Sequence, residues 1–556
     1  MANPQFDIVL ACDPAIGPGD SVDGFTPTIP LNTSLRLQDG VSLTSGRQNE
    51  TGAVGAGTLV FTLNNSSGDF TPDNTAGAYY PGWGLRKCIR FSWIDSDLSG
   101  TANLFTGYIT EIQEGWNNGK QPFVRVVATD RIGLLNERTM KALTVEEQLY
   151  DEPVLFYPLN DSQGSTTAGD QSVHRRQGLA VGTVGTGGTA VFGHTSDLGA
   201  DPETPCLVLT RSDASNGKYL TQSYADLTEL NAATGVTLEC YAYLPVAVSG
   251  TVRILELSKP LSTDILALDF VDNVPVAKVT IGSTVTATHG AAINDGAWHH
   301  VAAWYDGTDV KVYVDGADTS AAAALGTLTS TVLSVGGTNT GTTLANAWLS
   351  GVAVYDSALT DARMVQHGLG VTGATGETTR DRFNRIVRLA VGAWSESIED
   401  QPTTTMCAQP FAGQSAATLL QAVADAEIAP IYCNGAGELV WSARSSRSSD
   451  ADPITVASTQ VDSSTGFSTS LALVVNEATV ERPGGAKITA SDATSIAANG
   501  RISESMTLYY DTDAQVSKAA AYIVNTRSEP RVRMGALSVD LVTSGLDTET
   551  LLGPGV

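Results

Sequence analysis

The stretch that most constrains the fold is 295–316, which reads DGAWHHVAAWYDGTDVKVYVDG. Its side chains alternate between two faces through 298–305 and again up to Asp315-Gly316, and a period of two is typical of β-strands. Asp306-Gly307 separates the two runs, and Asp-Gly between alternating runs is a strong signal for a tight hairpin. The stretch therefore predicts two adjacent antiparallel strands.

Length and composition indicate a β-rich protein of several domains. The chain has 556 residues, enough for about three domains. It contains 55 glycines, is rich in serine and threonine, and has few long helical patterns. This composition favours many short strands joined by turns. The formal net charge is −27. Such an acidic surface argues against nucleic-acid binding, sequence-specific or general, and against attraction to an anionic membrane.

Targeting signals and cysteine pairs are not visible in the sequence. No window approaches the roughly 18 apolar residues of a membrane helix, and residues 1–6 do not begin a secretory signal. We therefore expect synthesis in the cytoplasm and no membrane span. The six cysteines are widely scattered without a C-x-x-C pair, which favours buried free thiols over disulfides or a zinc site. They are Cys12, Cys88, Cys206, Cys240, Cys407 and Cys433.

Residues 151–370 carry three motifs in a fixed order. In chain order they are LFYPLNDSQGSTTAGD at 155–170, the hairpin at 295–316, and LSGVAVYDSALTDAR at 349–363. The sequences of these motifs and their order along the chain resemble those of laminin-G-like (concanavalin-type) domains. The resemblance implies a jelly-roll β-sandwich whose first and last strands pair in one sheet. This sandwich is predicted to be a domain inserted into a longer chain that folds around its two flanks.

Residues 1–150 are predicted to be a β-rich module. Short alternating patterns predict strands at 35–37, 59–63, 89–93 and 123–127. The runs LFTGYITEI at 104–112 and VRVVATDRIGLL at 124–135 resemble the N-terminal part of the tail-hub proteins of long-tailed bacteriophages. That resemblance implies that these runs form two strands of a β-barrel, after which the chain leaves the barrel.

Residues 371–556 contain both helical and strand patterns. Thr378 or Thr379 and Ser415 can cap helices with an apolar face, and a third helix is predicted near 513–528, before Pro530. Asn434-Gly435 predicts a second hairpin. Further strands are predicted at 471–475, 477–480 and 532–541. The order of these elements resembles the second half of phage tail hubs.

No set of residues typical of an enzyme site is evident. H-E-x-x-H, G-x-S-x-G and P-loop motifs are absent from the sequence, and a glycosidase carboxylate pair is defined by a separation that sequence does not give. His299 and His300 are adjacent on a strand, so they face opposite sides and cannot ligate one metal. We expect His300, on the face of Trp298 and Trp304, to be a satisfied histidine of the sandwich. The prediction is no catalytic residue, no cofactor and no metal.

Calcium and glycans are the two ligand classes to consider for the sandwich. Asp170 occupies a position where laminin-G-like domains often place a calcium ligand. However, Ser350-Gly351 stand where that family usually has an acidic pair, and calcium needs about 6–8 oxygen ligands. We therefore expect no calcium site. Trp348 is a candidate for glycan binding, with a core position as the alternative.

These observations predict a mainly β protein: two β-barrel-type hub halves, 1–150 and 371–556, the second with a few helices, and the inserted sandwich at 151–370. The hub resemblance implies a structural protein of the virion tail tip, assembled in the host cytoplasm, that closes the tail tube as a homotrimer. The implied partners are the distal tail ring protein, the tape-measure protein, other tail-tip proteins and, for the sandwich, host cell-wall glycan. Two alternatives remain open: a secreted or cell-surface glycan-binding protein, and a glycan-degrading enzyme with a lectin-like module.

Overall fold

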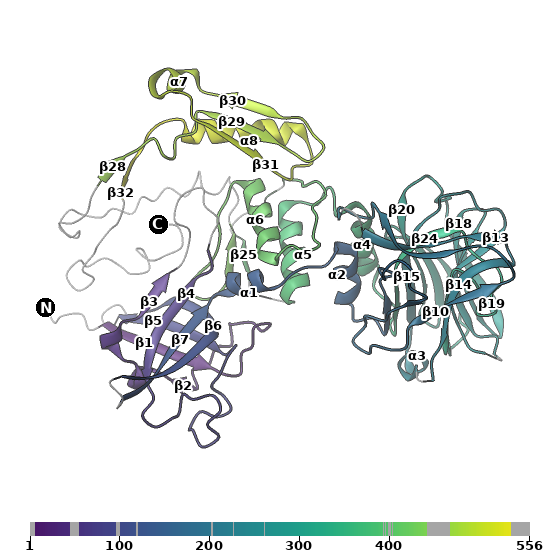
Figure 1. The fold of residues 1–556 in the computed structure, drawn as a ribbon, viewed down its shortest axis with the longest axis horizontal. Coiled ribbons are helices and arrows are strands. Elements are labelled where there is room, and N and C mark those ends of the chain that lie inside the picture. The colour runs from purple at the N-terminus through teal and green to yellow at the C-terminus, as the bar shows by residue number, and fades with distance from the viewer. Residues whose placement is uncertain are drawn as a thin grey trace. The chain divides into compact units, whose positions relative to one another are not determined.

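The chain divides into two compact units (Figure 1). The computed structural model describes residues 6–44, 55–95, 100–117, 121–201, 204–225, 227–260, 262–392, 394, 396–398, 402, 404–441 and 467–534. Unit 1 combines Met1–Thr139, Gly376–Cys407 and Gln414–Val556, whereas unit 2 combines Met140–Thr375 and Ala408–Gly413. The predicted mainly β fold is confirmed.

Unit 2 is a sandwich of two antiparallel sheets. The nine strands of one sheet are β9 (Thr167–Ala168), β10 (Leu179–Val184), β13 (Arg211–Asp213), β14 (Asn216–Ser223), β16 (Thr251–Ser258), β17 (Ile265–Val271), β18 (Val274–Ile281), β19 (Ser283–Thr288) and β23 (Val332–Val335). The eight of the other are β8 (Leu155–Tyr157), β11 (Ala190–Ser196), β12 (Thr204–Leu209), β15 (Val236–Tyr243), β20 (Trp298–Tyr305), β21 (Asp309–Val314), β22 (Ala317–Ala322) and β24 (Ala347–Tyr355). A short helix, α3 (Thr228–Ala232), precedes β15.

The strand orders place the core between the two sheets. The nine-stranded sheet runs β19-β18-β17-β16-β23-β14-β10-β9, with β13 paired to β14. The eight-stranded sheet runs β11-β12-β24-β15-β20-β21-β22, with β8 paired to β24. Fully buried apolar side chains from both sheets, such as Leu238, Val301 and Leu333, form one continuous core. Burial of this apolar area is the main stabilising term of the sandwich.

The predicted hairpin is confirmed as β20 and β21, which pair antiparallel. Its turn passes through Gly307 at φ +94°, a left-handed conformation that glycine adopts without steric strain. Val301, Ala303 and Tyr305 face the core between the sheets. The alternate residues of β20, from Trp298 to Trp304, therefore lie on the outer face of the eight-stranded sheet.

The sandwich begins and ends in the same sheet, as predicted. β8 pairs antiparallel with β24, with Tyr157 opposite Val352. Asp201 fastens the segment 408–413 to this unit, because its Oδ1 accepts the N–H groups of Phe411 and Ala412 at 2.7 Å each. The chain thus enters and leaves the sandwich from one sheet.

Two helices pack on the outer face of the eight-stranded sheet: α2 (Leu143–Tyr150) and α4 (Asp361–Leu369), which continues into the 3₁₀ turn η3 (Gly370–Thr372). The Thr360 side chain caps α4 by accepting the Arg363 N–H. Leu149 of α2 and Met364 of α4 pack into an apolar cluster with Trp304 of β20. Although α2 precedes residue 151, the predicted start of the insertion, it packs with the sandwich in a unit that starts at Met140.

Unit 1 contains a seven-stranded antiparallel sheet. Its strands are β1 (Phe6–Asp13), β2 (Ile29–Pro30), β3 (Ser42–Thr44), β4 (Thr58–Asn64), β5 (Cys88–Asp95), β6 (Gly100–Asn117) and β7 (Gln121–Thr129), in the order β2-β1-β5-β6-β7-β4-β3. The predicted strands at 59–63, 89–93 and 123–127 are confirmed. Asp130 then caps α1 (Arg131–Glu137) by accepting the Gly133 N–H at 3.1 Å.

The C-terminal part of unit 1 contains four longer helices and three small sheets among the described residues. The helices are α5 (Thr379–Val391), α6 (Ala416–Glu427), α7 (Ala493–Asn499) and α8 (Asp513–Arg527). The sheets combine β25 (Glu396–Ile398), β26 (Ile431–Cys433) and β27 (Leu439–Trp441); β28 (Phe467–Thr469) and β32 (Val532–Met534); and β29 (Glu477–Glu481), β30 (Ile488–Ser491) and β31 (Ser503–Thr507). Thr378, Ser415 and Thr512 cap α5, α6 and α8. The three predicted helices and the second hairpin are confirmed.

Two predicted strands are wrong. Leu35 makes only an isolated antiparallel bridge to Leu63 after the 3₁₀ turn η1 (Asn32–Ser34), and Leu37 already begins the 3₁₀ turn η2 (Leu37–Asp39). Arg36 pairs with Asp39 at 2.9 Å across this second turn. Residues 471–475 form a turn that the Val474 N–H closes on the carbonyl of Leu471. The predicted strand at 532–541 is observed only as β32, and its remainder lies outside the described residues.

Residues from before and after the sandwich contact one another within unit 1. The Trp394 indole N–H donates to the Pro18 carbonyl at 3.0 Å, and the Arg131 guanidinium lies 4.5 Å from the Trp394 ring centroid. The Thr106 hydroxyl donates to the Gly435 carbonyl at 2.8 Å. The two flanks therefore fold together although more than 200 residues separate them in sequence.

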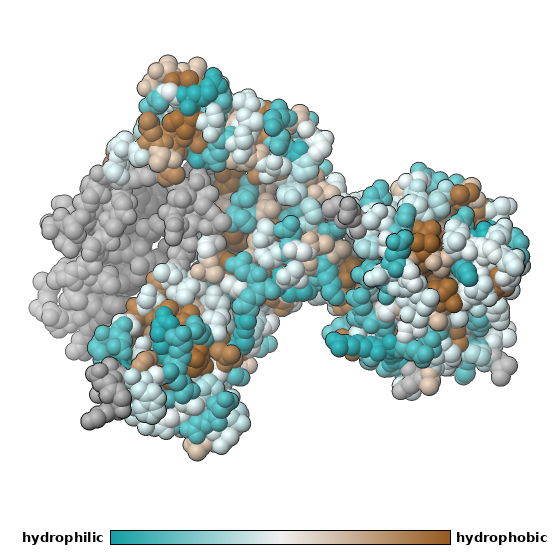
Figure 2. All heavy atoms as spheres, in the orientation of Figure 1, coloured by the Kyte–Doolittle hydropathy of each residue, from teal (hydrophilic) through white to brown (hydrophobic). Residues whose placement is uncertain are grey.

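In the view of Figure 2, residues of intermediate hydropathy cover much of unit 2, with hydrophilic and hydrophobic patches among them. Hydropathy by itself therefore does not mark a binding face. None of the helices among the described residues is long and apolar enough to cross a membrane. All six cysteines are free thiols, as predicted. The predicted burial is confirmed for Cys12, Cys88, Cys206 and Cys240, whereas Cys407 and Cys433 are only partly buried.

Candidate functional site

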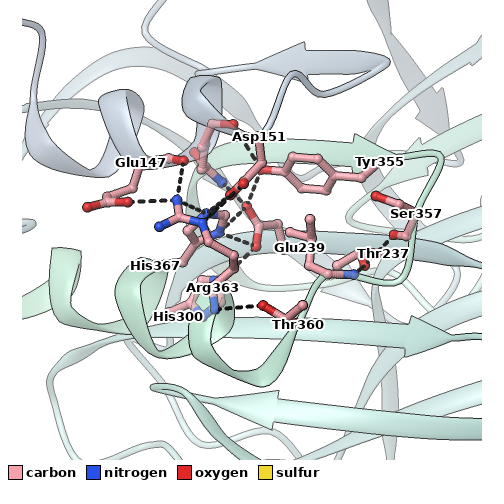
Figure 3. A network of polar contacts seen from close by, with 12 residues as sticks. Glu147, Asp151, Thr237, Glu239, His300, Tyr355, Ser357, Thr360, Arg363 and His367 are labelled. Atoms are coloured by element: carbon pink, nitrogen blue, oxygen red, sulfur yellow. Dashed lines mark hydrogen bonds and ion pairs between the residues drawn. The ribbon is translucent and has the colours of Figure 1, made fainter. Parts of the chain in front are cut away.

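The outer face of the eight-stranded sheet carries two clusters of side chains on neighbouring rows. One lies under α2 and α4 and is charged (Figure 3). The other lies toward the opposite ends of the same strands and is aromatic. Both arise because β15, β20 and β24 direct alternate side chains away from the core.

The charged cluster is centred on Glu239 of β15, which is fully buried. Its Oε1 accepts hydrogen bonds from Gln148 Nε2 and the Tyr355 hydroxyl, both at 2.8 Å. Its Oε2 lies 2.9 Å from both His300 Nε2 and His367 Nδ1. Four side chains from four elements thus satisfy a carboxylate that would be very unfavourable to bury alone.

His367 of α4 lies between two carboxylates. Its Nδ1 contacts Glu239 and its Nε2 lies 2.8 Å from Asp151 Oδ2. Arg363, one turn earlier, donates to Asp151 and, at 2.8 Å, to Glu147 Oε2. We call Glu147, Asp151, Glu239, Arg363 and His367 the buried clamp, because these charges join α2 and α4 to the sheet (Figure 3).

The pKa values of the clamp follow from its contacts. Burial alone would lower the pKa of His367, but the charge of Glu239 and the hydrogen bonds to Asp151 and Glu239 outweigh it and raise the pKa to about 9. Burial alone would raise the pKa of Glu239, but the charge of His367 and the hydrogen bond from His300 hold it well below its usual value. At neutral pH the pair is therefore an imidazolium and a carboxylate.

Glu239, His300 and His367 are also donors of the kind that zinc prefers, and their nearest atoms lie within 4.8 Å of one another. Ligands at about 2.0–2.1 Å from a tetrahedral zinc are roughly 3.3 Å apart. The 2.9 Å between Glu239 Oε2 and each histidine nitrogen is instead a hydrogen-bond distance. The trio could hold a metal only if His367 lost its proton and the three side chains moved apart.

The aromatic cluster crosses the sheet from β11 to β20. Trp348 lies 4.5 Å from His194 and 4.9 Å from Tyr243, and Tyr243 lies 5.9 Å from Trp298, measured between ring centroids. Tyr243 is the cross-strand partner of both tryptophans. We call these four residues the aromatic row. His194, Tyr243 and Trp348 are half-buried, whereas Trp298 is only 5% exposed.

The polar atoms of the aromatic row make few contacts with the protein. Among the described residues, the Tyr243 hydroxyl, the Trp348 indole N–H and the His194 ring nitrogens have no hydrogen-bond partner. The buried Nε1 of Trp298 likewise has no acceptor there. The buried donor of Trp298 is not accessible to a ligand, whereas the half-buried Tyr243, Trp348 and His194 leave rings and polar atoms open to one.

The residues that the sequence analysis considered as calcium or metal ligands hold the fold through hydrogen bonds and ion pairs instead. Asp170 accepts the N–H groups of Phe156 and Arg176 at 3.0 and 2.6 Å, so its carboxylate holds the turn after β9. Ser350 donates to the Pro158 carbonyl at 3.3 Å. His299 lies between Asp295 and Asp315 rather than beside His300.

His300 lies on the face of Trp298 and Trp304, as predicted, and this face is the outer one of the sheet. His300 is buried there under α4 and bonded to Glu239. Its Nδ1 has no partner among the described residues, so it is only partly satisfied. Trp348 is half-buried on the outer face of β24, where it packs against a small apolar cluster that includes Leu198 and Trp298.

Glu239, His367 and Tyr243 are functional candidates that the sequence did not reveal. Glu239 contacts His300, which lies 61 residues later in the sequence, and His367, which lies 128 residues later. The available signal was the alternation in β15, where Glu239, Tyr241 and Tyr243 share one face, as Trp298 and His300 do in β20.

The comparisons with known proteins concern the sandwich. Residues 216–364 match a laminin-G-type family described as the concanavalin A-like lectin/glucanases superfamily. This part of the chain is therefore a concanavalin A-like domain, as the motifs predicted. Among curated proteins, none matches the chain.

Solved structures with similarity include the binding domain of botulinum neurotoxin DC in complex with SialylT, at 12% identity and a TM-score of 0.31, covering 41% of this chain and 54% of that one. The binding domain of Paraclostridial mosquitocidal protein 1 is 12% identical with a TM-score of 0.29, over 40% and 52% of the two chains. The chain thus spans about half the length of these structures. Likenesses this distant carry no functional argument.

Proposed function

We propose that this protein is a structural component of the tail tip of a long-tailed bacteriophage, in which unit 1 closes the tail tube and the sandwich contacts host surface glycans. The observation that carries the proposal is the interruption of one compact unit by a complete sandwich. This arrangement suits a hub that carries an adhesion module, because the module begins and ends in one sheet and leaves the host fold intact.

The partners and location follow from the proposed role. The protein is a homotrimer in the virion, assembled in the host cytoplasm, and contacts the distal tail ring, the tape-measure protein and other tail-tip proteins. The net charge of −27 supports this role, since an acidic lumen does not bind a passing anionic genome. The protein acts as a scaffold and not as an enzyme.

The glycan part of the proposal is supported by the concanavalin A-like match at 216–364 and by the aromatic row. Aromatic rings bury the C–H face of a sugar, and their polar atoms bond its hydroxyl groups. The row has both features.

The test is electron microscopy of phage particles from a host that carries this gene, with antibody against unit 2. Label at the tail tip and three-fold density there are expected. Label elsewhere, or tail-tip symmetry that is not a multiple of three, would contradict the proposal. A zymogram on host cell wall is expected to show no clearing, whereas clearing would favour a glycan-degrading enzyme.

A further inference from the structure

We infer that the aromatic row binds neutral saccharides and discriminates against anionic ones. This inference rests on the proposed glycan contact and names its ligand class. Two properties of the row support it: three half-buried rings lie in contact, and the donors of Tyr243 and Trp348 have no acceptor among the described residues.

The rings and donors select a sugar over a purely apolar partner. A pyranose has one C–H face and a rim of hydroxyl groups. The faces of Trp348 and Tyr243 can bury the C–H groups, while the indole N–H and the phenol O–H bond the rim. A purely apolar partner would leave these polar atoms unpaired, which is unfavourable in a desolvated contact.

The charge around the row selects a neutral sugar. None of β11, β12, β15, β20 and β24 contains a lysine or arginine, and neither do the adjoining segments 197–201, 244–250, 293–297 and 370–374. The basic residues of the nearby clamp and hairpin are engaged, Arg363 with Asp151 and Lys311 with Asp361. Carboxylates and phosphates are usually held by arginine, lysine or a helix N-terminus. A sialylated, uronic or phosphorylated glycan would therefore meet no described cation here and a strongly acidic protein.

The test is a binding panel with the full-length chain. Neutral oligosaccharides of glucose, galactose, mannose and N-acetylglucosamine are compared with sialylated, uronic-acid and teichoic-acid ligands on an array, and hits are titrated by calorimetry at low and high salt. Neutral ligands are expected to bind, with affinity changing by less than about twofold with salt, because no ion pair is screened. Trp348→Ala is expected to weaken binding by about tenfold or more, which corresponds to at least 1.4 kcal/mol.

The controls separate folding from binding. Trp116→Ala removes a 69% exposed tryptophan of unit 1 and is expected to leave affinity unchanged. Tyr243→Phe deletes one hydroxyl while keeping the ring, so it is expected to weaken binding severalfold even if Trp348→Ala does not fold. Unchanged affinity in both row variants would overturn the inference.

Three other outcomes also contradict it. Binding of anionic ligands alone, with strong salt dependence, would overturn the neutral-sugar inference but leave the proposed glycan contact intact. Failure of every saccharide to bind would contradict both the neutral-sugar inference and the proposed glycan contact. Loss of oligomerisation in Trp348→Ala, without saccharide binding by the original chain, would mean that the row is an interface between copies.

Discussion

The two ends of one sheet face differ in what lies over them. At one end, α2 and α4 cover Glu239, His300 and Tyr355, and Glu239 has four donors. At the other end, Tyr243 and Trp348 of the same strands are half-buried, with polar atoms that no described residue engages. Identical strand geometry thus gives a structural cluster where helices supply partners and a candidate binding surface where they do not.

Excision tests whether the covering helices belong to the sandwich. Replacing 140–375 and 408–413, the two segments of unit 2, with short Gly/Ser linkers should leave unit 1 soluble and folded, since loop-closure entropy changes slowly with length. Replacing only 154–372 should leave α2 without its sheet, exposing Leu143 and the buried Glu147. Gel filtration and circular dichroism compare the two deletions. Insoluble protein from the larger deletion would mean that the sandwich is part of the core of unit 1.

Removing the centre of the clamp should have the largest effect of any single substitution. Glu239→Ala removes the buried carboxylate that accepts from Gln148, His300, Tyr355 and His367. Because these buried groups lose their acceptor, the change is expected to destabilise unit 2 by about 3–5 kcal/mol and lower its melting temperature by roughly 10 °C. Calorimetry measures the change. Asp318→Ala, which removes a more exposed carboxylate 3.5 Å from Lys311, should change stability by less than about 0.5 kcal/mol. An effect of Glu239→Ala as small as that of the control would show that the clamp does not hold the helices.

The clamp also predicts a pH dependence with a defined sign. The pKa of His367 is raised from 6.5 to about 9 on folding. Its contribution to stability is therefore complete below pH 6.5 and is lost as the pH rises through 9, by roughly 3 kcal/mol. Urea unfolding of unit 2 from pH 6 to 10 should show this decline. His367→Gln should flatten it, whereas His174→Gln, at a side chain 38% exposed, should not. An unchanged profile in His367→Gln would refute the assignment.

Sequence patterns could predict the elements whose cause is local. The hairpin of β20 and β21 follows from alternation and an Asp-Gly turn, and α5 and α6 follow from caps at Thr378 and Ser415. Residues 35–37 have the same alternation, but the side-chain pair Arg36–Asp39 favours a turn. Short runs are decided by such contacts rather than by period.

The two clusters of the outer face could not be predicted in the same way. Alternation places His300 on the face of Trp298 and Trp304, yet its neighbours Glu239 and His367 lie 61 and 67 positions away in the sequence, on two other elements. Trp348 was a candidate by residue type alone. Its value as a ligand surface depends on Tyr243 and His194 beside it, which the strand register decides.

Chelation should have the smallest effect. EDTA is expected to leave the melting temperature of unit 2 unchanged, because Asp170 is occupied by backbone N–H groups and the Glu239 cluster has hydrogen-bond spacing. Differential scanning calorimetry with and without EDTA, calcium and zinc checks this. A fall of several degrees that a metal ion reverses would show a bound ion and contradict this prediction.

The most direct test of the comparison is an NMR titration that follows the indole N–H signals of the eight tryptophans in the ¹⁵N-labelled full chain. Trp304 lies on the same sheet face as Trp348, but its Nε1 donates to the Leu359 carbonyl at 2.9 Å beside α4. On addition of a neutral oligosaccharide that the panel identifies, we expect shifts at Trp348 and Trp298 and none at Trp304. Shifts confined to Trp304 or to the tryptophans of unit 1 would contradict the assignment of the open end as the binding surface.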